Sequence, residues 1–133
     1  MFSKFSPAAR GVLRAAEQES RNHNHYYIGV EHLLVALLEQ HDGAISRRLS
    51  QEKIDSGEVH AEARRALGTG DEHPWEGILV TPRVRKVVAI AEERAAGRLI
   101  EPIDLLDAIL AEGQSAAAAA LARARTNGAV HRE

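Results

Sequence analysis

Residues 28–38 read IGVEHLLVALL, and residues 100–110 read IEPIDLLDAIL. Both segments place apolar side chains at the three- and four-residue spacing of a buried helix face. Each follows another matched segment, SPAARGVL at 6–13 and TPRVRKVV at 81–88. A Ser or Thr before Pro is a typical helix start, because the hydroxyl accepts a hydrogen bond from a first-turn amide and Pro has no amide to leave unpaired. The chain is therefore predicted to be a tandem repeat of helices.

The matched segments also predict where the repeats begin and end. The first repeat is expected to cover residues 5–68, with later helices near 44–49 and from about Asp55 to Gly68. Residues 69–79 combine turn formers with charge and lack an apolar period, so they are interpreted as a linker, which Trp75 is expected to pin to the body. The second repeat is expected to cover residues 80–125, with a last helix from about Ser115 to Arg125 and a frayed tail at 126–133.

Composition favours an all-α domain. Hydrophobic residues make up 44% of the chain and aromatic residues only 4%, while alanine is abundant, which suits packed helices better than a sheet. The net charge of −2 argues against a broad basic surface for nucleic acid. The chain contains no cysteine and no apolar run of membrane-spanning length. These features predict a cytoplasmic helical protein that binds neither nucleic acid nor membrane.

The sequence carries no pattern typical of an enzyme or a metal site. His23 and His25 are close in sequence, but a metal would need a third ligand with defined geometry, and no HExxH spacing exists. The alternative, which we prefer, is a loop whose histidines hydrogen-bond to nearby helix ends. A phosphate-binding GxxxxGK[ST] loop is also missing from the sequence. We therefore predict no catalytic residues, no metal and no cofactor.

Helix starts offer a different kind of site. Helices beginning after Ser6 and Thr81 would present backbone amides that favour an anion. Glu31 is expected near the start of the next helix, on the side away from the leucines. The helix dipole alone would explain an acidic residue there. The same arrangement would also suit a ligand with a cationic body and an anionic tip.

The segments SPxxR at 6–10, NHxYIGxEHLLxxL at 24–37 and TPRxxKV at 81–87 resemble the Clp N-terminal repeat domain of the ClpA and ClpC class of AAA+ unfoldases. The resemblance covers about Phe2 to Leu121. It implies two pseudo-symmetric four-helix repeats. It also implies a non-catalytic module that binds substrates and adaptors and hands them to a Clp ATPase ring and its peptidase partner.

In the ClpC branch such domains recognise phosphoarginine, a degradation mark. The hydroxyl and amides at a helix start hold the phosphoryl group there, and the glutamate of the GxEH segment meets the guanidinium. The resemblance assigns this role to Ser6, Glu31 and His32 in the first repeat and to a remnant site in the second repeat made of Thr81, Arg85, Ile103 and Asp104. Because Ile103 stands where a glutamate is expected, we predict at most one competent phosphoarginine pocket, around Glu31.

Related N-domains also present an apolar surface to cyclic peptide antibiotics. The matching positions are Phe2, Val80 and Lys86, with Val80 standing where the family commonly has Phe. Two alternatives to a Clp recognition module remain open at this point. In the first alternative, the chain is a free-standing protein that sequesters cyclic peptide antibiotics or serves as a decoy. Alternatively, it would be a structural interaction protein without ligand recognition, dimerising through its alanine-rich last helix.

Overall fold

The computed structural model of the chain describes residues 2–70 and 79–131. It confirms the predicted all-α class. The elements in chain order are α1 (Pro7–Asn22), β1 (Tyr27–Ile28), α2 (Val30–Glu39), α3 (Gly43–Gln51), α4 (Ser56–Leu67), β2 (Leu79–Val80), α5 (Pro82–Ala95), α6 (Pro102–Glu112) and α7 (Ala116–His131).

Side-chain caps fix the helix starts where the sequence predicted them. Ser6 Oγ accepts a hydrogen bond from the Ala9 amide at 3.1 Å, and Thr81 Oγ1 accepts one from the Val84 amide at 3.3 Å. Each cap is followed by Pro at the first helical position. The hydroxyl-proline pattern therefore sets the start of α1 and of α5 through the same local chemistry.

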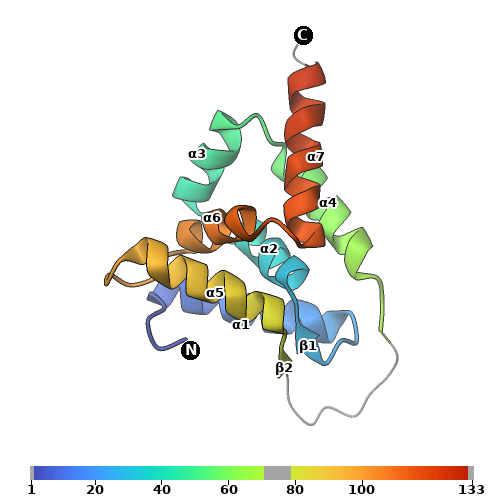
Figure 1. Cartoon of the computed structure of the whole chain (residues 1–133). Helices are drawn as coiled ribbons and strands as arrows, with labels where there is room; N and C mark the ends of the chain where they lie inside the picture. Colours follow the sequence, from blue (N-terminus) through green and yellow to red (C-terminus); the bar gives the residue numbers. More distant parts are fainter. Residues whose placement is uncertain (1, 71–78, 132–133) are drawn as a thin grey trace.

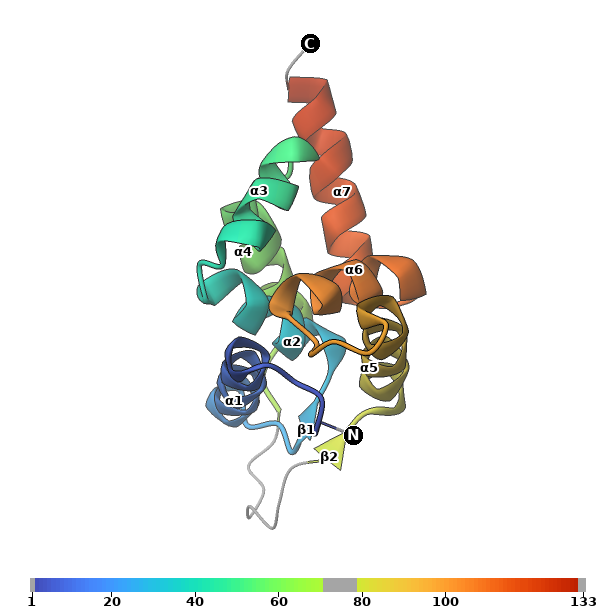
Figure 2. The ribbon, with the colours of Figure 1, turned by 90° about the vertical axis from the view of Figure 1, so that its left-hand side faces the viewer.

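The helices stack in layers around one apolar core. α1 and α5 lie on one side, α2 and α6 in the middle, and α3, α4 and α7 beyond them (Figures 1 and 2). α2 is apolar on nearly all sides, as expected of a helix enclosed by others, and its leucines 33, 34 and 37 are at most 1% exposed. Within the described residues no single helix is long and apolar enough to cross a bilayer. In the same part of the chain, α6 and the Ala116–Arg125 part of α7 meet that criterion jointly, across a bend of 92°.

The second half of the chain departs from the predicted four helices. The first half contains α1 to α4, as expected, whereas the described part of the second half contains three, α5 to α7. α7 is helical to His131 and does not end near Arg125. It projects past the other helices (Figure 1) and is joined to the first half by the ion pairs Arg123–Glu62 and Arg125–Glu52. The predicted contact of Trp75 lies outside the described residues.

Gly70 lies against the loop that follows α1, and this close approach predicts a measurable cost of substitution. A Cβ atom at Gly70 would stand 2.5 Å from the Asn24 carbonyl oxygen and 2.9 Å from His25 Cδ2. We expect Gly70→Ala to lower the free energy of unfolding by about 1–3 kcal/mol, because the backbone must shift to relieve the clash. Gly43→Ala is the matched control, since a Cβ there meets nothing within 4 Å. Urea unfolding that ranks the two variants equally would contradict the close approach.

Candidate functional site

Two short β contacts connect the halves of the molecule crosswise. β1 pairs in parallel with β2, in the register Tyr27 with Leu79 and Ile28 with Val80, and the Thr81 amide donates to the Ile28 carbonyl at 3.1 Å. The other contact is a parallel bridge between Phe5 and Ile100, where the Ser6 amide donates to the Ile100 carbonyl at 3.0 Å.

The crosswise pairing decides which helix starts are neighbours. β1 leads into α2 and β2 leads into α5, so the Glu31 end of α2 lies beside the Thr81 end of α5 (Figure 2). In the same way the Ile103 end of α6 lies beside the Ser6 end of α1. The structure thus places Glu31 beside Thr81 and not beside Ser6, with which the prediction grouped it. Each candidate site combines the two halves.

Glu31 is the second residue of α2 and is partly exposed. Across residues 2–70 and 79–131, its carboxylate has no hydrogen bond or ion pair to another side chain or backbone group. Gly29 precedes it, and a Cβ atom on Gly29 would stand 3.6 Å from Glu31 Oε2. The glycine therefore places no side chain against the carboxylate, which lies at the amino end of α2.

The start of α5 complements this carboxylate. Thr81 is partly exposed, and its hydroxyl accepts a hydrogen bond from the Val84 amide. Pro82 has no amide to donate. The Arg83 amide lies in the first turn of α5, so it has no acceptor within the helix. Ser6, at the start of α1, is only 2% exposed. The hydroxyl expected to meet a ligand is thus accessible at Thr81 and enclosed at Ser6.

The remnant site is occupied by internal contacts. Ile103 is partly buried, and both carboxylate oxygens of Asp104 accept hydrogen bonds from Arg98, each at 2.7 Å. Asp104 also accepts from the Glu101 amide at 2.8 Å. Burial alone would raise the pKa of Asp104, but the bonds from Arg98 and the Glu101 amide outweigh it and lower the pKa. Asp104 is therefore an ionised helix cap, not a free ligand for a guanidinium.

Comparison with known proteins places this geometry in a family. The Clp repeat (R) N-terminal domain matches residues 4–121. The chain belongs to the Clp N-terminal domain family. The ClpC/MecB negative regulator of genetic competence of Bacillus subtilis is 30% identical over 124 residues, which is 91% of this chain and 15% of that protein. The ClpB chaperone of Oceanobacillus iheyensis is 30% identical over 95 residues, which is 71% of this chain and 12% of that protein.

Solved structures agree on the fold. The N-terminal domain of the Arabidopsis thaliana chaperone ClpD superposes with a TM-score of 0.68 at 16% identity, over 99% of both chains. The Candida albicans Hsp104 N-terminal domain gives a TM-score of 0.66 at 13% identity, over 98% of this chain and 92% of that one. The chain thus has the Clp N-domain fold and spans only about an eighth of the length of the curated relatives.

His32, which was predicted to contact a ligand, is enclosed by the fold in this Clp N-domain. It is fully buried, its Nδ1 accepts the Gly29 amide at 2.9 Å, and its Nε2 lies 2.8 Å from His25 Nδ1. Burial, together with nearby positive charge on His25 and His23, lowers the pKa of His32 to about 4. His32 therefore caps α2 in the neutral form, as Asp104 caps α6 in the ionised form.

The remaining predicted positions of the Clp N-domain are spread over separate elements. Arg85 and Lys86 are exposed on α5. Phe2 packs edge-on against Phe5, at a ring separation of 5.2 Å, whereas Val80 pairs with β1. Phe2 thus lies beside the Phe5–Ile100 bridge and Val80 lies in the β1–β2 contact, and a shared apolar peptide surface remains a prediction.

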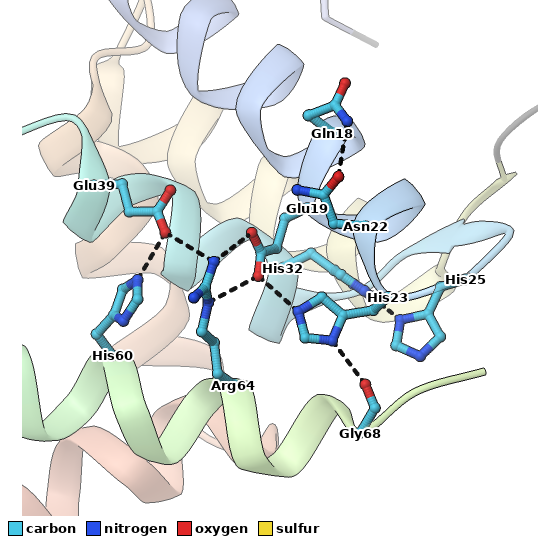
Figure 3. Close-up of polar contacts among 10 residues, drawn as sticks. All are labelled: Gln18, Glu19, Asn22, His23, His25, His32, Glu39, His60, Arg64 and Gly68. Carbon is cyan, nitrogen blue, oxygen red and sulfur yellow. Dashed lines mark hydrogen bonds and ion pairs between the residues drawn. The ribbon is translucent and has the colours of Figure 1, made fainter.

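Sequence reasoning missed a buried carboxylate in this Clp N-domain. Glu19 is 4% exposed and lies between α1 and α4, where Arg64 donates to both of its oxygens at 3.0 and 3.2 Å (Figure 3). The signal was present in the helical spacing, because Glu19 falls three residues after buried Ala16, on the inner side of α1. A charge on that side is unusual unless it is paired.

Proposed function

We propose that this chain is a non-catalytic recognition module of the Clp unfoldase–protease system, which binds substrates, adaptors or phosphoarginine-marked proteins. The observation that carries the proposal is the Glu31 carboxylate, which has no partner among the described residues and lies beside the amino end of α5. Membership of the Clp N-domain family supports it, because related proteins are named as a ClpB chaperone and as an ATP-binding subunit of the Clp protease.

The chemistry of the site suits phosphoarginine. The carboxylate of Glu31 would accept hydrogen bonds from a guanidinium, and the Thr81 hydroxyl with the Arg83 amide would donate to the phosphoryl oxygens. The amino ends of α2 and α5 both favour negative charge, so they attract the phosphoryl group of the ligand. They do not attract the guanidinium, and the Glu31 carboxylate is needed for that cationic part. Ile103 offers no such partner at the remnant site, which supports a single binding site.

Calorimetric titration of the full chain with phosphoarginine tests this proposal. We expect one site per chain in the wild type and a loss of affinity of about 10- to 150-fold in Glu31→Gln, since a hydrogen-bonded charge contributes roughly 1.5–3 kcal/mol. Glu93→Gln is the matched control, because Glu93 is an exposed glutamate on α5. Equal affinity in the wild type and in Glu31→Gln would overturn the assignment of the site.

A gain of function provides the converse test. Ile103→Glu restores a carboxylate at the position equivalent to Glu31, beside the start of α1. Because Ser6 is enclosed, we expect this second site to remain at least tenfold weaker than the Glu31 site. Two sites of equal affinity in Ile103→Glu would show that the exposure of the helix-start hydroxyl does not matter.

A further inference from the structure

The β1–β2 contact has one face in the core and one face toward solvent. It lies at the end of the molecule opposite the tip of α7 (Figures 1 and 2). Successive side chains of a strand point to opposite faces, so the register puts Ile28 and Val80 on one face. Tyr27 and Leu79 share the other face. Ile28 is 2% exposed, whereas Leu79 is 65% exposed, so the face of Tyr27 and Leu79 is the outer one.

The outer face continues into the proposed phosphoarginine site. The backbone is still extended at Gly29 (φ −100°, ψ 176°) and at Thr81 (φ −66°, ψ 153°). Continuing the register from the pair Tyr27 and Leu79 therefore sets Gly29 opposite Thr81, on the same outer face. A Cβ atom on Gly29 would stand 3.5 Å from Tyr27 Cε2 and 3.6 Å from Glu31 Oε2. The tyrosine ring and the carboxylate thus flank the same glycine.

Tyr27 and Leu79, which we call the apolar pair, are held in place before any ligand arrives. The partly exposed Tyr27 ring stacks on the His25 ring at 5.1 Å and meets the buried His32 ring edge-on at 5.3 Å. The Leu79 amide donates to the Tyr26 carbonyl at 3.0 Å, which fixes the backbone from which the leucine side chain projects. A ligand therefore finds the apolar pair already formed, which lowers the entropy lost on binding.

The spacing along this face matches the spacing of an extended peptide. The apolar pair lies two residues before Gly29 and Thr81, a distance of about 6.6 Å along a strand. In an extended peptide, side chains two positions apart point to the same side with the same separation, and the side chain between them points away. A peptide whose phosphoarginine reaches Glu31 and Thr81 would therefore lay the side chain two positions away over the apolar pair.

We propose that Tyr27 and Leu79 form a second subsite, which binds an apolar side chain two positions from a phosphoarginine in an extended peptide. The inference rests on the proposed function of the Glu31 site. An apolar side chain placed there removes exposed surface of Leu79 from water, whereas a polar side chain gains little. Because apolar side chains are mostly buried in folded proteins, the subsite favours marked segments that are unfolded.

Two synthetic peptides of identical composition test the spacing by calorimetric titration of the full chain. Each contains one central phosphoarginine and two leucines in a glycine background, with an acetylated and an amidated end. The leucines flank the phosphoarginine at two positions' distance in the first peptide and at one position's distance in the second. We expect the first peptide to bind about five- to tenfold more tightly, the effect of covering part of one leucine side chain. Equal or reversed affinities would overturn the proposal.

A substitution of Leu79 tests the residue itself. In Leu79→Ser the preference for the first peptide should disappear, while binding of free phosphoarginine shows that the variant is folded. Leu99→Ser is the matched control and should keep the preference, because Leu99 is also an exposed leucine, at 51%, and lies between α5 and α6. A preference that persists in Leu79→Ser would overturn the subsite.

Free phosphoarginine separates this inference from the proposed function on which it rests. If the wild type does not bind free phosphoarginine, the proposed function fails and the subsite fails with it. If the wild type binds free phosphoarginine through Glu31 but does not distinguish the two peptides, the proposed function stands and only the subsite is overturned.

Discussion

Arg64→Ala is expected to lower the free energy of unfolding by about 2–3 kcal/mol. The substitution leaves the Glu19 carboxylate, whose side chain is 5% exposed, without the guanidinium that binds both of its oxygens. Removing one member of a buried ion pair typically costs 3–5 kcal/mol, because the other charge is stranded away from water. We place the effect below that range because Arg64 is itself 46% exposed and its removal admits water to Glu19.

The neighbouring arginine provides the control for this prediction. Arg65 is exposed on the same helix and forms none of the ion pairs seen among residues 2–70 and 79–131. Arg65→Ala should therefore change the free energy of unfolding by no more than about 0.5 kcal/mol. Urea denaturation at neutral pH compares the two variants directly. Indistinguishable midpoints would mean that Glu19 does not depend on Arg64.

The second large effect is a loss of stability in acid that depends on His32. Its pKa is about 4 in the folded protein and near 6.5 in the unfolded chain, so the unfolded state binds more protons as the pH falls. Above about pH 6.5 both states are neutral at this residue and the free energy of unfolding is constant. Between about pH 6.5 and pH 4 it should fall by about 3 kcal/mol in total, through His32 alone.

His32→Asn isolates this contribution. An asparagine oxygen can still accept the Gly29 amide, as Asp104 does for Glu101 in the second half, but it does not titrate. The slope of stability against pH between about pH 6.5 and pH 4 should therefore be smaller in the variant. Because His25 contacts His32, the difference in slope between the wild type and His32→Asn reports the combined contribution of both histidines. Parallel slopes would show that His32 is not buried in its neutral form.

The sequence patterns predict the helices, but they do not predict which helix starts lie beside one another. Ser6 and Thr81 act through local hydrogen bonds within one turn, so the hydroxyl-proline pattern predicts both helix starts. The β contacts are only two residues long and show no alternation of apolar and polar residues. The pairing of Ile28 with Val80 is therefore visible only in the fold, and with it the grouping of Glu31 with Thr81.

The two capping side chains were within reach of sequence reasoning. His32 and Asp104 occupy the third position of their helices, where a side-chain acceptor often reaches back to the amide before the helix. Read that way, the equivalent positions would have been identified as caps and not as ligand contacts. The partners of Asp104 are less predictable, because Arg98 precedes α6 in a loop whose path depends on tertiary packing.

The crosswise β contacts have a consequence for the origin of the two halves. In the first half of the chain, the segment around Phe5 and the strand β1 do not pair with each other. If such a half existed alone, each segment would find a hydrogen-bonding partner only in a second copy of the same half. A symmetric pair of identical chains would then hold two identical pairs of neighbouring helix starts, and any substitution would alter both. Joining the copies in one polypeptide removes that constraint, so Glu31 can be retained while its counterpart becomes Ile103.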